Sequence, residues 1–324
     1  IMTTYKEIRG TNIEAVASDP SNPIEGQVWY NTTTNAVKGF GRSAVSAWST
    51  ANSSNSFHRN SGAAGTQTAA LTFGGRPSPG PGAATESYNG TNWTEVNDLN
   101  QARHYFAGAG TQTAALGFGG YNGGTLYALT ETWNGTNWTE VNDMNTARGR
   151  VSGTGATNTA ALAIGGYPAP LTALVETWNG TNWTAVNNLG TARYSGAASG
   201  TNTAALMIGG TIAGSGITAV TELWNGTNWT EVNDLNTARK YLAGCGTQTA
   251  AIVFGSGGPP KAITELWNGT NWTETSDMLN GREGMAGAGT NTAALGIGGE
   301  SPQTATEEFL GAGSQTALIF EVSN

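Results

Sequence analysis

The chain of 324 residues contains 48 glycines and 11 tryptophans, only 11% of its residues are charged, and its formal net charge is −8. So many tryptophans supply large apolar side chains to bury, which excludes a disordered chain. The abundance of Gly, Thr, Asn and Ser disfavours long helices. The 14 Lys and Arg form no basic run, so we expect no nucleic-acid partner. No stretch approaches the roughly 20 apolar residues of a membrane helix, so we expect no membrane insertion.

Cysteine and histidine are too scarce for most metal or redox chemistry. A single thiol, Cys245, excludes an intramolecular disulfide framework. With only two histidines, His58 and His104, beside that thiol, a zinc site of the ordinary type is excluded as well. The sequence therefore predicts no metal site and no cofactor.

Residues 1–43 contain no repeat and are predicted to form an N-terminal anchoring segment. Within it, GQVWYN at 26–31 and AVKGF at 36–40 flank a polar turn, which is typical of a β-hairpin. The run from 5 to 40 resembles the opening of structural and tail-fibre proteins from tailed phages of marine bacteria, in which such a hairpin precedes a variable domain. The resemblance implies that residues 1–43 dock to other virion proteins and that the rest of the chain faces outward.

Residues 44–324 are predicted to form a second domain, which is dominated by an internal repeat. WNGTNW at 133–138 recurs at 178–183, 224–229 and 267–272, and with a leading Tyr at 88–93. The second aromatic position of this repeat holds Trp48, Trp93, Trp138, Trp183, Trp229 and Trp272. The first aromatic position holds Tyr88, Trp133, Trp178, Trp224, Trp267 and Phe309.

Each repeat can be divided into four short strands. In one repeat a strand of small residues begins at Arg103, an apolar strand over 114–120 ends on two glycines, and two further strands cover 129–133 and 138–141. A period near 45 residues with four antiparallel strands is the size of one propeller blade. We expect the small residues to lie near a crowded axis and the tryptophans to fill the wider space between blades.

The order of these features resembles the Kelch repeat: an apolar strand closing in Gly-Gly, an aromatic residue before a turn, a Trp about five residues on, and then an Arg. The resemblance covers residues 58–311 and implies an all-β, six-bladed Kelch-like β-propeller with four-stranded blades. The fifth unit departs from it, with Ser256 after Gly255. Cys245 aligns with Ala109 and is predicted to be a small filler of the innermost strand.

The sixth unit lacks its own fourth strand, and two segments could supply it. Residues 45–51 contain Trp48 in the correct register, and residues 316–322 form an apolar run near the C-terminus. We favour 45–51, so that the last blade is closed by an N-terminal strand.

Every repeat also carries a glutamate in its third strand and, in most repeats, an arginine before its first. His58 occupies the arginine position of its own unit. Because a group repeated in every blade serves the scaffold more often than a single active site, we expect a structural role, such as an ion pair between blades or a hydrogen bond to a turn.

Two classes of propeller enzyme share features with the repeat. Sialidases have a Ser-x-Asp-x-Gly-x-Thr-Trp box, and here Gly135 fits the turn, but Glu131 and Trp133 stand where the box needs Ser and Asp. A copper site like that of galactose oxidase needs His ligands and a Cys–Tyr crosslink, which these residues do not offer. We therefore predict that the protein is not an enzyme and has no catalytic residues.

Because consecutive strands run in opposite directions, the connections of each repeat alternate between two opposite faces, and one face is the better candidate for binding. The first and third connections of each repeat are nearly identical between repeats, whereas the second and fourth differ in length and composition, and variable loops on a rigid scaffold often carry function. Drift of unselected surface loops is the competing explanation. The predicted ligand-binding residues on this loop face are His104, Tyr105, Tyr121, Tyr127, Arg150, Tyr167, Tyr194, Lys240 and Tyr241.

Together these patterns predict a non-enzymatic phage virion protein that forms part of a tail fibre, spike or appendage. It would recognise a host surface glycan or protein through the loop face, in a homo-oligomer or multicopy assembly whose avidity offsets weak single sites. A secreted or surface-attached bacterial adhesion propeller is the alternative, and a propeller glycosidase ranks third.

Overall fold

The computed structural model describes residues 14–20, 27–42, 46–77, 80–167, 171–312 and 315–320. The chain divides into two compact units: unit 1 comprises Ile1–Ser46 with Gly311–Asn324, and unit 2 comprises Ala47–Leu310. Regular structure in the described residues is β-strand, apart from one 3-10 turn at Ala213–Ser215. None of the residues placed in this way belongs to a helix long and apolar enough to cross a bilayer.

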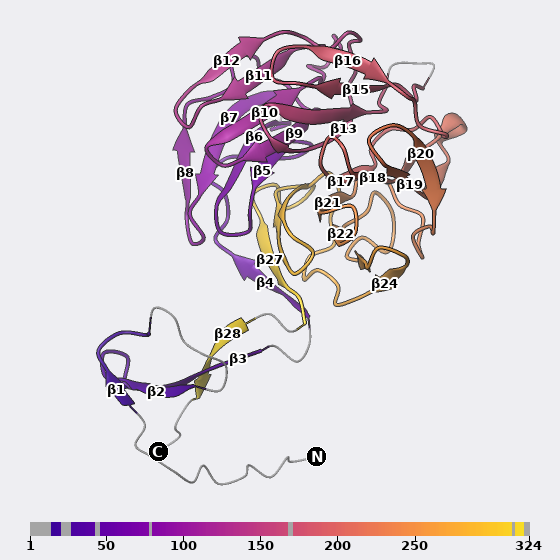
Figure 1. The fold of residues 1–324 in the computed structure, drawn as a ribbon. Helices are drawn as coiled ribbons and strands as arrows, with labels where there is room; N and C mark the ends of the chain where they lie inside the picture. Colours follow the sequence, from indigo (N-terminus) through magenta and orange to yellow (C-terminus); the bar gives the residue numbers. More distant parts are fainter. Residues whose placement is uncertain are drawn as a thin grey trace. The chain divides into compact units, whose positions relative to one another are not determined.

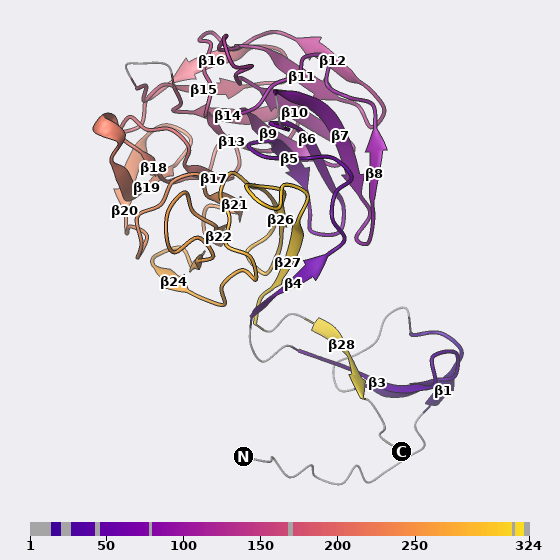
Figure 2. The same cartoon turned by 180° about the vertical axis from the view of Figure 1, so that it is seen from behind.

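Unit 2 contains six four-stranded antiparallel sheets, arranged about a common axis in Figures 1 and 2. Sheet 1 contains β5 (Gly62–Gly65), β6 (Ala70–Gly75), β7 (Gly82–Tyr88) and β8 (Trp93–Val96). Sheet 2 contains β9 (Ala107–Thr111), β10 (Ala114–Phe118), β11 (Thr130–Trp133) and β12 (Trp138–Val141). Sheet 3 contains β13 (Ser152–Thr157), β14 (Ala160–Ile164), β15 (Val175–Trp178) and β16 (Trp183–Val186).

The remaining three sheets of unit 2 follow the same plan. Sheet 4 contains β17 (Ala197–Gly200), β18 (Ala205–Thr211), β19 (Ile217–Trp224) and β20 (Trp229–Val232). Sheet 5 contains β21 (Ala243–Gly246), β22 (Ala251–Phe254), β23 (Thr264–Trp267) and β24 (Trp272–Glu274). Sheet 6 contains β25 (Ala286–Gly289), β26 (Ala293–Ile297), β27 (Thr306–Leu310) and β4 (Ala47–Ala51).

The first strand of each sheet is the innermost. β5 contacts β9, and the contacts continue through β13, β17 and β21 to β25, which contacts β5 again. Small residues are needed here because neighbouring backbones approach closely: a Cβ added at Gly108 would lie 2.5 Å from the carbonyl oxygen of Ala63 in the adjacent sheet. This all-β arrangement fits a β-propeller.

Aromatic side chains fill the space between neighbouring sheets, as the repeat predicts. Phe118 of sheet 2 packs in one apolar cluster with Trp178 and Trp183 of sheet 3. The indole N–H of Trp183 also donates to Thr130 Oγ1 of sheet 2 at 2.9 Å. Eleven of the twelve predicted aromatic positions are buried, and Trp229 is partly exposed. Each space between neighbouring sheets, or wedge, is therefore filled by an apolar cluster, and five of the six wedges also contain a buried indole–threonine hydrogen bond.

One wedge lacks this hydrogen bond, and its repair gives a testable prediction. The position equivalent to Thr130 holds Val175, and the buried Nε1 of Trp229 has no hydrogen-bond partner among the described residues. We expect Val175→Thr to supply the missing acceptor and raise the free energy of unfolding by about 0.5–1.5 kcal/mol in urea denaturation. The matched change Thr130→Val should lower it by about 1–3 kcal/mol. Equal effects of the two changes would contradict this interpretation.

The outer strand of sheet 6 comes from the N-terminal side, as predicted. β4 pairs with β27 in antiparallel register, with Trp48 opposite Phe309. The rival C-terminal run does not enter this sheet: β28 (Gln315–Phe320) pairs instead with β3 (Ala36–Arg42) in unit 1. The chain therefore leaves the repeat region beside the strand through which it entered.

Unit 1 is one four-stranded sheet with the order β1 (Glu14–Val16), β2 (Val28–Asn31), β3 and β28. The predicted hairpin is present as β2 and β3. The structure differs from the predicted division at residues 43 and 44, because β28 joins the N-terminal segment and makes this unit discontinuous. Residues 1–13, which include part of the phage-like segment, lie outside the described residues.

A single carboxylate links the loop before β2 to the hairpin. Asp19 accepts hydrogen bonds from Trp29 Nε1 at 3.0 Å and Asn31 Nδ2 at 2.7 Å, and pairs with Lys38 Nζ at 2.7 Å. These donors, led by Lys38, lower the pKa of Asp19 to about 2. The hairpin residues recognised in the sequence thus converge on one acceptor.

Candidate ligand-binding site

Buried acid–base pairs hold the connections at the loop face. Each joins an arginine before the inner strand to a glutamate on the third strand of the same sheet: Arg103–Glu131, Arg148–Glu176, Arg193–Glu222, Arg239–Glu265 and Arg282–Glu307. All ten side chains are at most 3% exposed. The structural role predicted for this pattern fits, but the ion pair lies within a sheet and not between blades.

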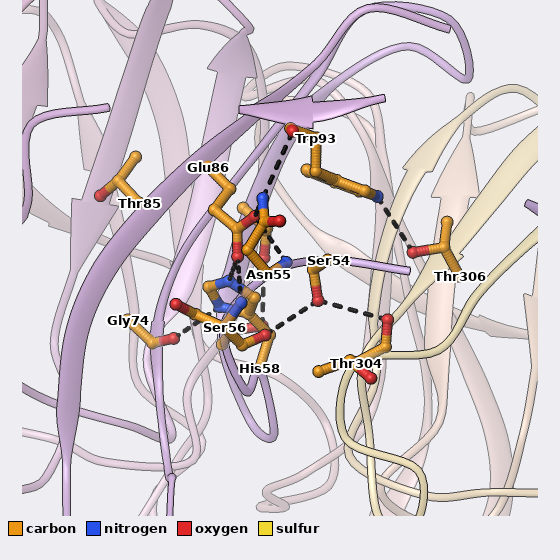
Figure 3. Close-up of polar contacts among 12 residues, drawn as sticks. Ser54, Asn55, Ser56, His58, Gly74, Thr85, Glu86, Trp93, Thr304 and Thr306 are labelled. Carbon is orange, nitrogen blue, oxygen red and sulfur yellow. Dashed lines mark hydrogen bonds and ion pairs between the residues drawn. The ribbon is translucent and has the colours of Figure 1, made fainter. Parts of the chain in front are cut away.

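His58 replaces arginine in sheet 1 and reaches the same type of acceptors (Figure 3). Its ring nitrogens lie 3.0 Å from Glu86 Oε1 and 3.0 Å from the carbonyl oxygen of Gly74. Glu86 also accepts the backbone N–H groups of Asn55 and Ser56 at 2.8 and 2.7 Å. Burial alone would raise the pKa of Glu86, but the hydrogen bonds from His58 and these amides outweigh it and lower that pKa. His58 is therefore a scaffold residue.

Two residues after each of these positions, the backbone closes a hydrogen-bonded ring. The backbone N–H of each ring residue donates to the backbone carbonyl oxygen of the ring residue that precedes it around the circle, at 2.6–3.1 Å. The six ring residues are Asn60, Tyr105, Arg150, Ser195, Tyr241 and Gly284. All six residues have φ between 53° and 66°. This backbone conformation is unfavourable for residues other than Gly and Asn, so Tyr105, Arg150 and Tyr241 are strained. The hydrogen bonds of the ring hold them in it.

The ring brings four of the predicted tyrosines around one predicted cation. The Arg150 guanidinium carbon lies 4.7 Å from the centroid of Tyr105, 5.2 Å from Tyr194, 5.7 Å from Tyr241 and 6.0 Å from Tyr167. These distances are within the range of cation–π attraction. Arg150 and Tyr167 belong to the repeat of sheet 3, whereas Tyr105, Tyr194 and Tyr241 belong to those of sheets 2, 4 and 5, so the cluster depends on contacts between sheets.

A hollow of about 310 Å³ opens beside this cluster. It is lined by Tyr105, Tyr121, Leu126, Gly149, Arg150 and Tyr167. Tyr167 is 40% exposed, which is unusual for a large aromatic side chain in this protein. Volumes of roughly 300–1,000 Å³ are typical of small-ligand sites, and aromatic walls with a few polar groups are their usual lining. We refer to these six residues as the tyrosine hollow.

His104 lies beneath the hollow and does not line it. Its side chain is 3% exposed and contacts Tyr105 and Tyr121, with ring centroids 4.7 and 5.5 Å away. Burial first, and then the positive charges of Arg76, Arg150 and Arg59, lower its pKa to about 4. The structure thus places His104 outside the lining, with its ring covered by the tyrosines, and its predicted contact with a ligand stays a prediction.

The shifted pKa of His104 predicts a pH dependence of stability. The unfolded chain protonates this histidine near pH 6.5, whereas the folded protein does so near pH 4. The contribution of the neutral His104 to the free energy of unfolding should thus be fully present above about pH 7. It should be lost as the pH falls from 6.5 to 4, by up to about 3 kcal/mol. His104→Phe keeps an aromatic ring but cannot titrate, so its unfolding free energy should decline less than that of the unchanged protein over this interval. Parallel declines would contradict the assignment.

The other predicted residues lie nearby in different roles. Tyr127 accepts a hydrogen bond from Asn122 within its loop and does not line the hollow. Lys240 contacts Tyr241, with its Nζ 5.7 Å from the ring centroid. Sequence reasoning missed Leu126 and Gly149 of the lining and the whole backbone ring. A signal for the ring was present, since Asn60 and Gly284, which tolerate positive φ, stand two residues after the repeated His or Arg.

The opposite end of the axis holds a larger cavity of different character. It has a volume of about 590 Å³ and is lined by small residues of the six inner strands and their turns, including Gly110, Ala156 and Cys245. Cys245 is 8% exposed, and burial raises the pKa of its thiol well above the ordinary value. It occupies an inner strand as a small side chain, as predicted.

Comparison with known proteins supports the fold. No family model matches the chain, and no curated protein matches its sequence. The chain is similar to a solved structure titled "Structure of YjhT", with a TM-score of 0.67 and 12% sequence identity, over 83% of this chain and 100% of that one. At this identity the likeness shows a propeller-like fold alone. The Kelch type, the phage resemblance and the function stay predictions.

Proposed function

We propose that unit 2 is a closed, six-bladed propeller of Kelch type that recognises a host surface glycan or protein without enzymatic activity. The cyclic contacts of the inner strands, the backbone ring and the pairing of β4 with β27 support closure in six blades. The repeat order of Gly-Gly, aromatic, Trp and Arg supports the Kelch type. Unit 1, which contains the phage-like hairpin, would attach the propeller to other virion proteins in a multicopy appendage.

The tyrosine hollow is the single observation that carries the recognition function. Its rings have apolar faces and polar hydroxyls, which suit stacking against sugar rings or a protein loop. The six lining residues include no carboxylate, thiol or imidazole, which supports binding without turnover. Strained backbone at Tyr105 and Arg150 adds support, because strain concentrates at functional sites.

The location and the recognition function need separate experiments. Mass spectrometry of purified phage particles should detect the chain, and its absence from them would contradict the virion assignment. On a glycan array, Tyr167→Ala should weaken binding at least about tenfold, as expected when one stacking aromatic is lost. Phe57→Ala is the matched control, since Phe57 is 51% exposed in the connection before sheet 1 but lies outside the hollow. Equal losses in both variants would argue against the hollow as the site.

A further inference from the structure

Arg150 is one of two arginines in the described repeat region that have no acidic partner, and it is the one that lines the tyrosine hollow. Five arginines form the buried pairs with glutamate, and Arg59 pairs with Glu283 at 3.1 Å and Glu300 at 3.2 Å. Among the residues that the structure describes, no ion pair or side-chain hydrogen bond is formed by Arg150. Its charge is therefore available at the wall of the tyrosine hollow.

The geometry of the cluster leaves the donors of this guanidinium usable. Tyrosine rings attract a guanidinium through its planar face, while its N–H groups radiate in that plane and can bind a carboxylate or phosphate in bidentate fashion. Tyr105 and Tyr194 lie closest, at 4.7 and 5.2 Å. Rings at these distances restrict the arginine side chain before a ligand arrives, which lowers the entropy lost on binding.

The lining of the hollow carries the positive charge of Arg150, although the chain as a whole carries −8, and Glu283 near Tyr241 is paired with Arg59. Arg76 and Lys240 on the same face also have no ion pair among the described residues, and no glutamate or aspartate lines the hollow. The low pKa of His104 reflects, after burial, the charges of Arg76, Arg150 and Arg59. Charge complementarity thus favours an anion at this position.

We infer that the tyrosine hollow binds an acidic saccharide, with a carboxylate or phosphate group on Arg150 and a sugar ring against Tyr105, Tyr121 and Tyr167. This inference rests on the proposed recognition function and names the ligand class of the same site. Neutral sugars would use the aromatic walls but would leave the guanidinium without its counter-ion.

The test compares one sugar ring carrying different charges. Glucose, glucuronate and glucose 6-phosphate are each coupled to a polymer, and binding of the purified full-length protein is measured by biolayer interferometry. At least one acidic conjugate should bind ten- to a hundredfold more tightly than glucose, the range expected for a charge-assisted hydrogen bond. Preference for glucuronate identifies a carboxylate as the anion, and preference for glucose 6-phosphate identifies a phosphate.

Variants separate a specific contact from a general charge effect. Arg150→Gln keeps an unbranched side chain at φ 53° and should reduce acidic binding to the glucose level, while Arg150→Lys should keep part of it. Lys261→Gln removes a cation that pairs with Glu300 outside the hollow and should change affinity less than about twofold. Thermal unfolding of each variant checks that the fold is retained.

Failure of the ligand class and failure of the proposed function give different results. Equal binding of all three conjugates that is insensitive to Arg150→Gln but lost in Tyr167→Ala would overturn the acidic class and leave recognition by the hollow intact. If no conjugate binds and no array ligand depends on Tyr167, both are overturned.

Discussion

Replacing Arg148 with methionine is expected to lower the free energy of unfolding of unit 2 by about 3–5 kcal/mol, because it leaves a buried carboxylate without its counter-ion. Arg148 is 0% and Glu176 is 2% exposed, and their N···O distance is 2.7 Å. The guanidinium also donates to the carbonyl oxygens of Gly165 and Leu174 at 2.9 and 2.8 Å. One substitution thus removes three bonds at the base of a loop-face connection. Urea denaturation followed by tryptophan fluorescence measures the loss.

The double variant Arg148→Met with Glu176→Leu tests whether the unpaired charge is the cause. Removing both partners should restore part of the stability, since no charge is then buried alone. Recovery should be incomplete, because Glu176 also accepts the backbone N–H of Asn145 at 2.7 Å, and that donor loses its acceptor. A double variant as unstable as Arg148→Met would show that lost packing dominates.

A milder change is suggested by sheet 1 of the same chain. Arg148→His should cost less than Arg148→Met, because His58 spans a carboxylate and a glycine carbonyl with one imidazole. The equivalent acceptors in sheet 3 are Glu176 and Gly165. Equal destabilisation by His and Met would mean that the sheet 1 solution depends on its own surroundings.

Trp48→Ala is expected to lower stability by about 3–5 kcal/mol and to open the last sheet. Trp48 is 5% exposed, lies 4.9 Å from the ring of Phe254 and 5.3 Å from that of Phe309, and donates to Thr264 Oγ1 at 3.1 Å. Its strand pairs with β27 across a loop that contains the entire repeat region. Closing a loop roughly 50 times longer than a hairpin turn costs roughly 3 kcal/mol more in chain entropy. The packing of Trp48 must offset this cost.

Hydrogen exchange distinguishes opening of the ring from a simple cavity. In Trp48→Ala, backbone amides of β27 and of the neighbouring inner strand β5 should exchange faster. Trp183→Ala removes an equivalent side chain in sheet 3, where a short turn joins β15 to β16. There we expect a comparable loss of stability with faster exchange limited to the adjacent wedge. Identical exchange patterns around sheet 6 in the two variants would contradict closure by β4.

Much of the scaffold could be predicted from local sequence. An apolar strand ending in Gly-Gly, an aromatic residue before a turn and a Trp after it recur in each repeat. These features specify four short strands without reference to residues in other repeats. Trp48 could be placed in sheet 6 because its register with the other tryptophans is unambiguous. The hairpin of residues 28–42 was equally local, since two β-rich runs flank a polar turn.

The acid–base pattern was visible but its geometry was not. Spacing showed that Arg148 and Glu176 recur with the repeat, and repetition indicated a structural role. It did not show that the two side chains meet inside one sheet, because that depends on how the connection before β13 folds back over β15. The terminal run 315–320 was ambiguous for a similar reason: an apolar strand pairs with whichever open edge lies within reach, and β3 provides it.

The all-β repeat and its aromatic positions could be recognised in the amino-acid sequence, because they follow from contacts between residues close in the repeat. The strand that completes the sixth sheet could be recognised as well, because Trp48 continues the spacing of the other tryptophans although its partner strand lies at the far end of the repeat region. The position of Arg150 among four tyrosines, beside a buried His104, follows instead from the folded arrangement of the sheets. Tyr105, Tyr194 and Tyr241 come from other repeats than Arg150, and they meet it through a backbone ring whose hydrogen bonds exist only when the sheets meet. A cluster built from residues of four repeats exists only where those repeats meet, and no single repeat specifies it.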